Sequence, residues 1–132
     1  ILPFDFLLAD SPHSTQARTA EILKTNEMIL DIGPKTSKYY QEIISQNPNI
    51  IFNGPMGYLE NPIFSKNSIQ ILQEISKQEN SFLGGGDSLK LIKLAKLKNK
   101  DFKFVSMGGG AMLQYIACHG QLETLNKIKQ SQ

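Results

Sequence analysis

Short apolar runs alternate along the chain with longer amphipathic stretches, and this alternation limits the fold more than any other feature of the sequence. Five runs have the length of strands, are followed by residues typical of turns, and cover residues 4–9, 28–32, 49–52, 81–83 and 102–105. Short, near-continuous apolar strands are typical of a parallel sheet that is buried on both faces. We therefore expect helices in the connections between them.

The stretches between these runs fit that expectation. Apolar residues recur at helical spacing in residues 35–46, 62–78, 88–98, 111–118 and 122–129. Residues 11–24 are ambiguous, and we expect a surface connection there with some helix or a small hairpin. The sequence thus predicts an α/β fold, a parallel sheet flanked by helices on both faces in a Rossmann-like three-layer αβα arrangement. In such sheets, ligands bind beyond the carboxyl ends of the strands.

Composition excludes several classes of protein. The 132 residues fit one domain, and a hydrophobic share of 40% with 20% charged residues excludes a disordered or collagen-like chain. A formal net charge of +2 is too small to indicate a nucleic-acid or anionic-membrane partner. Six lysines gather between positions 88 and 103, and we favour a solvated helix face over an anion-binding patch for them.

The single cysteine, Cys118, excludes an internal disulfide and is consistent with a reducing compartment. We expect Cys118 to be buried or half-buried, and His13 and His119 to lie at the surface. No apolar run has the length of a membrane span and no basic segment opens the chain, so we expect a cytoplasmic protein without a membrane partner. Because the first residue is Ile, we expect a chain that is processed, excised or recorded in part.

Two glycine triplets follow predicted strands, Gly84-Gly85-Gly86 before Asp87-Ser88 and Gly108-Gly109-Gly110 before Ala111. Glycine admits a positive φ and lets an anion approach the backbone, and a helix N-terminus offers free N–H groups. One triplet alone is equally well explained as a tight turn with Asp87 as the helix cap. Two triplets at two strand ends of one sheet favour a polyphosphate site, with Asp87 on a magnesium ion. Neither triplet matches GxxxxGK[ST] or GxGxxG.

A third loop, residues 53–60, follows the run at 49–52 and reads Asn-Gly-Pro-Met-Gly-Tyr-Leu-Glu. Asn53 ends a strand and has an amide that can donate, and Glu60 could accept two sugar hydroxyls. On the pattern alone, a simple Asn-Gly-Pro turn with a solvated Glu60 is the better interpretation.

Five segments taken together resemble phosphoglycerate kinase: ILPFDFLLAD from Ile1, DIGPKT from Asp31, NGPMGYLE from Asn53, GGGDS from Gly84 and SMGGGA from Ser106. They occur in the order of that family and at about its spacing, up to about Tyr115. The resemblance implies that residues 1–132 are part of the C-terminal, nucleotide-binding domain, most of its second half. The N-terminal domain, which binds phosphoglycerate in the family, has no counterpart in this sequence.

The resemblance also implies roles for individual positions. Six of them would bind one side of ADP or ATP: Asn53 (phosphates), Gly54 and Pro55 (adenine side), Tyr58 and Leu59 (base and ribose) and Glu60 (ribose hydroxyls). Four would hold the phosphates, with Mg²⁺ on the acid: Gly85, Gly86, Asp87 and Ser88. Gly109 and Gly110 would offer N–H groups to the transferred phosphoryl group, and with Gly85 they are the predicted catalytic positions. The family usually has a small residue at Tyr58, an aromatic residue at Leu59 and Thr at Met107.

The implied activity is a glycolytic kinase reaction, phosphoryl transfer between 1,3-bisphosphoglycerate and MgADP that gives 3-phosphoglycerate and MgATP. The resemblance implies a monomer, and this chain alone is expected to be inactive. The alternatives are a non-catalytic nucleotide-binding module and a structural or interaction protein whose sites have decayed. Half of a parallel sheet exposes an apolar edge, so we expect poor solubility of the isolated chain.

Overall fold

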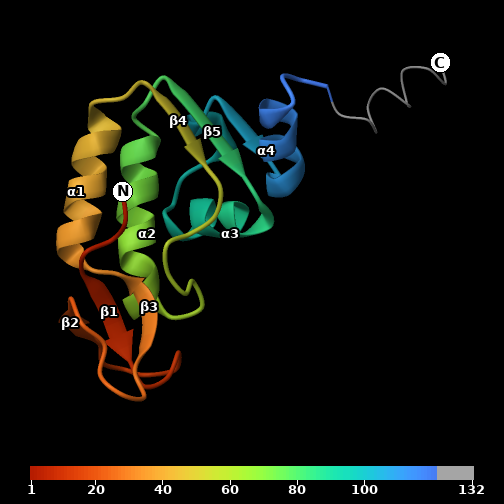
Figure 1. Ribbon diagram of the computed structural model, residues 1–132. Helices are drawn as coiled ribbons and strands as arrows, with labels where there is room; N and C mark the ends of the chain where they lie inside the picture. The colour runs from red at the N-terminus through yellow and green to blue at the C-terminus, as the bar shows by residue number, and fades with distance from the viewer. Residues whose placement is uncertain (122–132) are drawn as a thin grey trace.

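Residues 1–121 are described by the computed structural model, and they form two separate three-stranded sheets with helices packed around them (Figure 1). The first sheet is antiparallel with the order β2-β1-β3, and its strands are β1 (Phe6–Ala9), β2 (Arg18–Ala20) and β3 (Met28–Ile32). The second sheet is parallel with the order β4-β5-β6, and its strands are β4 (Asn49–Phe52), β5 (Asn80–Gly84) and β6 (Phe104–Ser106).

The prediction that residues 4–9 and 28–32 belong to the parallel sheet is wrong. Both runs form strands, but β1 pairs with β2 and β3 in antiparallel register, with Leu8 opposite Arg18 and Leu7 opposite Asp31. The physical reason lies in the connections: no helix separates these three strands, and antiparallel neighbours need only short loops, whereas a parallel pair needs a crossover. Of the two expectations for residues 11–24, the hairpin is the one observed.

Helices connect the strands of the parallel sheet as predicted, and the α/β class is confirmed. The helices are α1 (Pro34–Ser45), α2 (Pro62–Ile75), α3 (Gly86–Leu94) and α4 (Gly109–Ala117), with a short 3-10 helix, η1 (Asn99–Asp101), before β6. Their bounds differ from the predicted ones by a few residues at each end, as helix ends commonly do. The predicted helix at 122–129 lies outside the described residues.

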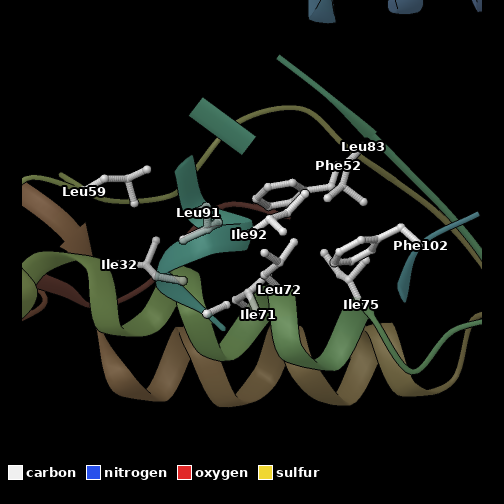
Figure 2. Packing of buried hydrophobic residues seen from close by; sticks show 11 residues of the cluster. Ile32, Phe52, Leu59, Ile71, Leu72, Ile75, Leu83, Leu91, Ile92 and Phe102 are labelled. Atoms are coloured by element: carbon white, nitrogen blue, oxygen red, sulfur yellow. The ribbon is translucent and has the colours of Figure 1, made fainter. Parts of the chain in front are cut away.

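One face of the parallel sheet carries the main core (Figure 2). Phe52 and Leu83 point from β4 and β5 towards α2 and α3, where they meet the buried side chains Ile71, Leu72, Ile75, Leu91 and Ile92. α1 packs on the outside of α2 (Figure 1). Because β4 and β5 are held by this core, the loops at their carboxyl ends start from fixed points.

The opposite face of the parallel sheet is only partly covered, by α4. Ile51, Phe82 and Phe104 are aligned across the three strands on this face, and Ile51 and Phe104 remain about half exposed, at 51% and 53%. Met112, Tyr115 and other residues of α4 border the groove above them, which has a volume of about 810 Å³. Helices therefore lie on both faces, while complete burial of both faces is not observed in the described residues.

The expectation for Cys118 is wrong, because this residue is exposed just after the last turn of α4. The sequence placed it after an apolar stretch, but α4 is buried mainly at Met112, and Tyr115 and Ile116 near the end of the helix are already 45% and 43% exposed. His13 and His119 are exposed, as predicted. Within residues 1–121, every helix is too short or too polar to cross a membrane.

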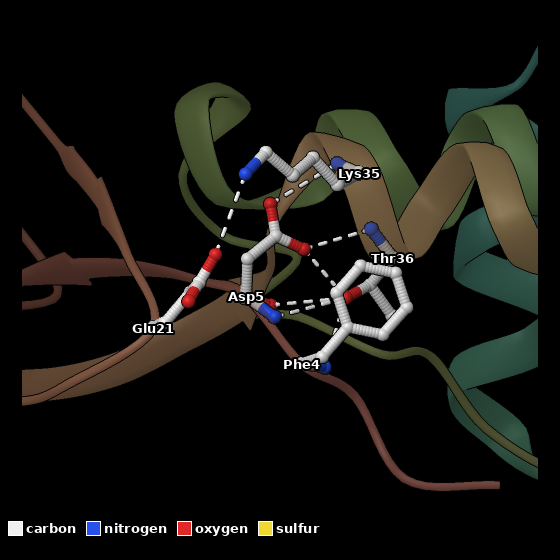
Figure 3. A network of polar contacts seen from close by, with 5 residues as sticks. All are labelled: Phe4, Asp5, Glu21, Lys35 and Thr36. Atoms are coloured by element: carbon white, nitrogen blue, oxygen red, sulfur yellow. Dashed lines mark hydrogen bonds and ion pairs between the residues drawn. The ribbon is translucent and has the colours of Figure 1, made fainter.

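The antiparallel sheet is joined to α1 through a buried carboxylate (Figure 3). Asp5 is 1% exposed, and its side chain accepts hydrogen bonds from the backbone N–H groups of Lys35 (3.1 Å) and Thr36 (2.7 Å). The hydroxyl of Thr36 donates to Asp5 Oδ1 at 2.5 Å and accepts from the backbone N–H groups of Phe4 and Asp5. α1 has no side-chain cap from its own N-cap residue, Gly33, so Asp5 caps it from a distant part of the chain.

The same network explains the lysine at the start of α1, where a cation is unfavourable. Lys35 uses only its backbone N–H near the helix end, and its ammonium extends to Glu21 at 3.3 Å (Figure 3). Burial raises the pKa of Asp5, but the hydrogen bonds from Thr36 and Lys35 outweigh burial, and the pKa lies below 3.8. The carboxylate is therefore ionised at neutral pH and complements the positive end of α1.

This cap predicts a stability loss for Thr36→Val, which keeps the side-chain volume but removes the hydroxyl. Asp5 then loses one donor, and the backbone N–H groups of Phe4 and of the buried Asp5 lose their acceptor, so the free energy of unfolding should fall by about 1–3 kcal/mol. Thr36→Ser keeps the hydroxyl and should retain most of the stability. Urea denaturation of the three proteins checks this, and equal stability of the Val and Ser variants would contradict it.

Candidate functional site

The polar and glycine-rich loops after β4, β5 and β6 meet at one edge of the parallel sheet. Asn53 follows β4, Gly85 follows β5, and Gly109 opens the helix after β6. The backbone N–H of Gly85 donates to the carbonyl of Ser106 at 3.0 Å, which joins the two glycine loops directly. A Cβ atom on Gly109 would lie 2.2 Å from Oδ1 of Asn53 and 2.9 Å from the nitrogen of Gly85. The two triplets are therefore neighbours, with the Asn53 amide against both.

The glycines at this edge serve two different physical needs. Gly54 and Gly85 have positive φ angles of 104° and 96°, which other residues rarely adopt. Gly84 and Gly109 lie where a side chain would collide with Asn53 or with backbone. Gly86 and Gly110 have open space around them and no positive φ angle, so neither the backbone conformation nor a steric clash requires glycine there. At Gly86 and Gly110 the absence of a side chain leaves the backbone open to a ligand.

Two helices begin at this edge, α3 at Gly86 and α4 at Gly109. Neither receives a hydrogen bond from the side chain of its N-cap residue. The N–H groups in the first turn of a helix have no acceptor within the helix, and they carry the positive end of its dipole. Two such ends beside each other can bind an extended anion such as a diphosphate.

Asp87 and Ser88 lie in the first turn of α3 but face different surroundings. Asp87 is exposed at the edge. Ser88 is fully buried, and its hydroxyl donates to the carbonyl of Gly84 at 2.7 Å. The structure thus leaves Asp87 accessible to a ligand and commits the Ser88 hydroxyl to the turn itself.

The loop 53–60 is fixed from beneath by α2 and β3. The N–H groups of Met56 and Gly57 donate to the Ser68 hydroxyl at 2.9 and 3.1 Å, and the N–H of Tyr58 donates to the carbonyl of Leu30 at 2.9 Å. Leu59 is 6% exposed and belongs to the main core (Figure 2). This loop is therefore a rigid wall of the site and not a free turn.

Asp31 supports this wall and was not among the residues that the sequence singled out. It is 0% exposed on β3 and accepts hydrogen bonds from Asn67 Nδ2 at 3.1 Å and from the Ile32 N–H at 2.8 Å. A Cβ atom on Gly57 would lie 2.5 Å from its carboxylate. Burial raises the pKa of Asp31 to about 6, although these hydrogen bonds act in the opposite direction. The signal in the sequence was a carboxylate inside the apolar run at residues 28–32.

A hollow of about 160 Å³ lies between this loop and the start of α3. It is lined by Pro55, Gly57, Tyr58, Leu59, Glu60 and Asp87. Tyr58 is half-buried and also packs against the small cluster of Ala9, Leu30 and Phe64. Because complete small-molecule sites usually enclose about 300–1,000 Å³, these residues can form one side of a ligand site. The larger groove under α4 is almost wholly apolar.

Glu60 lies at the rim of this hollow and is paired with Lys90 of α3. The hydrogen bond from the Lys90 ammonium lowers the pKa of Glu60 below its ordinary value. Glu60 is thus ionised at neutral pH and acts only as a hydrogen-bond acceptor, which suits it to contacts with hydroxyl groups.

The donor set fits a metal ion that arrives with phosphate groups. Among residues 1–121, no three His, Cys, Asp or Glu side chains come together in a way that could hold a metal. Mg²⁺ usually keeps several waters and is bound by one or two carboxylates together with substrate phosphates. The exposed carboxylate of Asp87, in the first turn of α3, has the chemistry of such a site.

Comparison with known proteins places this geometry in a family. A family profile described as phosphoglycerate kinase matches residues 1–119. The chain is 37% identical over 124 residues to the phosphoglycerate kinase of Wolbachia sp. subsp. Brugia malayi, an alignment that covers 89% of this chain and 31% of that protein. It is 32% identical over 118 residues to the enzyme of Maridesulfovibrio salexigens. The chain thus spans about a third of the length of these curated relatives.

Solved structures give the same result. The phosphoglycerate kinase of Coxiella burnetii matches 87% of this chain with a TM-score of 0.76 and 33% identity, and the match covers 31% of that chain. The enzyme of Pyrococcus horikoshii matches 96% of this chain with a TM-score of 0.77 and 29% identity, and the match covers 32% of that chain. The resemblance inferred from five short motifs therefore extends over the described fold.

The contact between the two glycine loops predicts opposite outcomes for two neighbouring substitutions. Gly109→Ala places a methyl group against Asn53 and the Gly85 backbone, so we expect a loss of about 1–3 kcal/mol in the free energy of unfolding. Gly110→Ala meets open space in the first turn of the same helix and should leave stability unchanged or slightly higher. Thermal and urea unfolding of both variants measure this, and a Gly109→Ala protein as stable as Gly110→Ala would refute the packing described.

The buried Asp31 predicts a pH dependence of stability. Its pKa is higher in the folded state (about 6) than the ordinary 3.8, so the folded chain binds more protons between these values. Its contribution to stability therefore falls as the pH rises from about 4 to about 6, by a total of about 3 kcal/mol, and is constant above that range. Asp31→Asn lacks this titration. Urea unfolding across this pH range should show that the stability of the parent falls relative to that of Asp31→Asn. Parallel pH profiles of the two proteins would contradict a raised pKa of Asp31 in the folded state.

Proposed function

This chain belongs to the phosphoglycerate kinase family, and we propose on that premise that it supplies the nucleotide-binding part of an enzyme that transfers a phosphoryl group between 1,3-bisphosphoglycerate and MgADP. The products of this glycolytic reaction are 3-phosphoglycerate and MgATP. The observation that carries the proposal is the meeting of Asn53, Gly85 and Gly109 at the edge where α3 and α4 begin.

On this proposal the first turns of α3 and α4 bind the phosphates. Their N–H groups, at Gly86, Asp87, Gly109 and Gly110, donate to phosphate oxygens, and the Asn53 amide donates beside them. Gly85 gives the turn its positive φ and so aims these groups. Ser88 holds the same turn from inside, because its hydroxyl donates to the carbonyl of Gly84.

The hollow beside α3 takes the nucleoside. Pro55 and Tyr58 provide apolar surface for the base, with Gly54 and the buried Leu59 shaping the loop behind them. The ionised Glu60 accepts hydrogen bonds from the ribose hydroxyls. Asp87 lies between the hollow and the helix N-termini, which is the position needed to hold Mg²⁺ on the phosphates. When bound, Mg²⁺ supplies charge neutralisation of the phosphate oxygens.

The chemistry of this transfer makes few demands on acid or base groups. The attacking oxygen of ADP is already anionic at neutral pH, and the leaving carboxylate is a weak base, so neither needs proton transfer. Positioning and charge stabilisation are then the main requirements, and helix N-termini and glycine loops meet them. Phosphoglycerate itself is proposed to bind to a part of the enzyme that this chain does not contain, and the setting of the reaction is proposed to be the cytoplasm.

One observation favours a second candidate, a nucleotide-binding module without catalysis. Met107 occupies the turn between β6 and α4 and is 78% exposed, so this turn presents a thioether where a hydroxyl could contact the transferred group. Such a module would bind MgADP at the same edge but would not complete the transfer.

Titration of the 132-residue chain with ADP tests the binding part of the proposal. We expect binding that strengthens with Mg²⁺, and a loss of most of this magnesium dependence in Asp87→Asn, because the substitution removes the one protein carboxylate offered to the metal. The control is Glu79→Gln, which makes an equal change of charge at an exposed acid just before the first residue of β5, at the end of the strand away from the glycine loop. This variant should leave the magnesium dependence of ADP binding unchanged. Calorimetry gives both affinities, and identical values for the two variants would remove Asp87 from the site.

An activity assay after reconstitution distinguishes the two candidate functions. Mixing the chain with the remaining part of a related phosphoglycerate kinase should give ATP formation if the chain is catalytically competent. Magnesium-dependent binding without any ATP formation would favour the second candidate.

A further inference from the structure

The ion pair between Glu60 and Lys90 has no part in the phosphate site, yet it joins two elements that border the same hollow. Glu60 ends the loop after β4, and Lys90 lies on α3 one turn after Asp87. Both side chains are about half exposed, at 51% for Glu60 and 43% for Lys90. A surface ion pair of this kind contributes little to folding stability. Its main effect is therefore on the position of the Glu60 carboxylate.

The backbone around Glu60 is fixed on both sides. Before it, Leu59 is buried in the main core. After it, Asn61 caps α2 by accepting from the Ile63 N–H at 3.0 Å, and its Nδ2 donates to the carbonyl of Pro12 at 2.9 Å. The direction of the Glu60 side chain is therefore the main freedom left at this position, and the ammonium of Lys90 selects one direction.

The pairing also leaves Glu60 able to accept further hydrogen bonds. Lys90 donates to Oε1, and the carboxylate also has a hydrogen bond from the backbone N–H of Glu60 itself. A carboxylate has about four acceptor positions, so these two donors do not saturate it. A ligand with neighbouring hydroxyls can thus be accepted while the ion pair stays intact.

Resting on the proposed function, we propose that Lys90 is a positioning residue of the nucleotide site, which orients Glu60 towards the ribose and so sets the preference for ribonucleotides over 2′-deoxyribonucleotides. Lys90 touches neither the phosphates nor the base. It acts through Glu60, so its loss changes the recognition of the 2′-hydroxyl and leaves the phosphate contacts of α3 and α4 in place.

The test compares ADP with 2′-deoxy-ADP, each with Mg²⁺, by calorimetry on the 132-residue chain. The parent should bind ADP more tightly. In Lys90→Gln this preference should fall by about two- to five-fold, the range that corresponds to a surface ion pair. Lys90→Arg keeps a cation that can pair with Glu60 and should restore it. The matched control is Lys93→Gln, which removes the same charge from an exposed lysine in the last turn of α3 and should lower affinity for both nucleotides equally.

Each result of this comparison either supports or overturns the role of Lys90. An unchanged preference in Lys90→Gln, or tighter ADP binding because the lysine competes with the ribose, overturns the role of Lys90 while the proposed function stands. A parent chain that binds both nucleotides equally overturns it too, because Glu60 then does not read the 2′-hydroxyl. A folded parent chain that binds neither nucleotide overturns the proposed function together with this inference. Circular dichroism of each variant shows that the fold is retained.

Discussion

The candidate site depends on the close approach of two backbones around one amide. Gly85 and Gly109 come together at the edge of the parallel sheet, and Oδ1 of Asn53 occupies the space that a side chain on Gly109 would need. This contact puts the first turns of α3 and α4 beside each other. Separate helix N-termini each attract an anion weakly, whereas two that are held together offer a preorganised set of donors. The proposed phosphate-binding role rests on that arrangement.

The antiparallel sheet contributes to the same site from the other side. Asp31 on β3 and Ser68 on α2 support the loop 53–60, and the buried Asp5 anchors this sheet to α1. Buried polar groups of this kind are favourable only when their hydrogen bonds are satisfied, and in the described residues all buried side-chain polar atoms have partners. The polar interior thus fixes the wall of the hollow beside α3, and the apolar core fixes the strand ends.

Local sequence patterns predicted most of the elements, because the spacing of apolar residues reports which side of an element is buried. They also predicted that Asn53 and the two glycine triplets would share one edge, since parallel strands with crossover helices bring their carboxyl ends together. The patterns failed for residues 4–9 and 28–32, where an apolar strand looks the same in either kind of sheet. They failed also for Cys118, whose burial depends on what packs beside it.

The α/β class, the order of strands and helices along the chain, and the chemical types available at the strand ends can all be predicted from local residue patterns. Which strands pair, which carboxylate caps α1, and which lysine meets Glu60 were decided by the tertiary structure. Such contacts join residues that are about 30 positions apart. No local pattern encodes them, because each depends on how separately formed elements are brought together by the burial of their apolar faces.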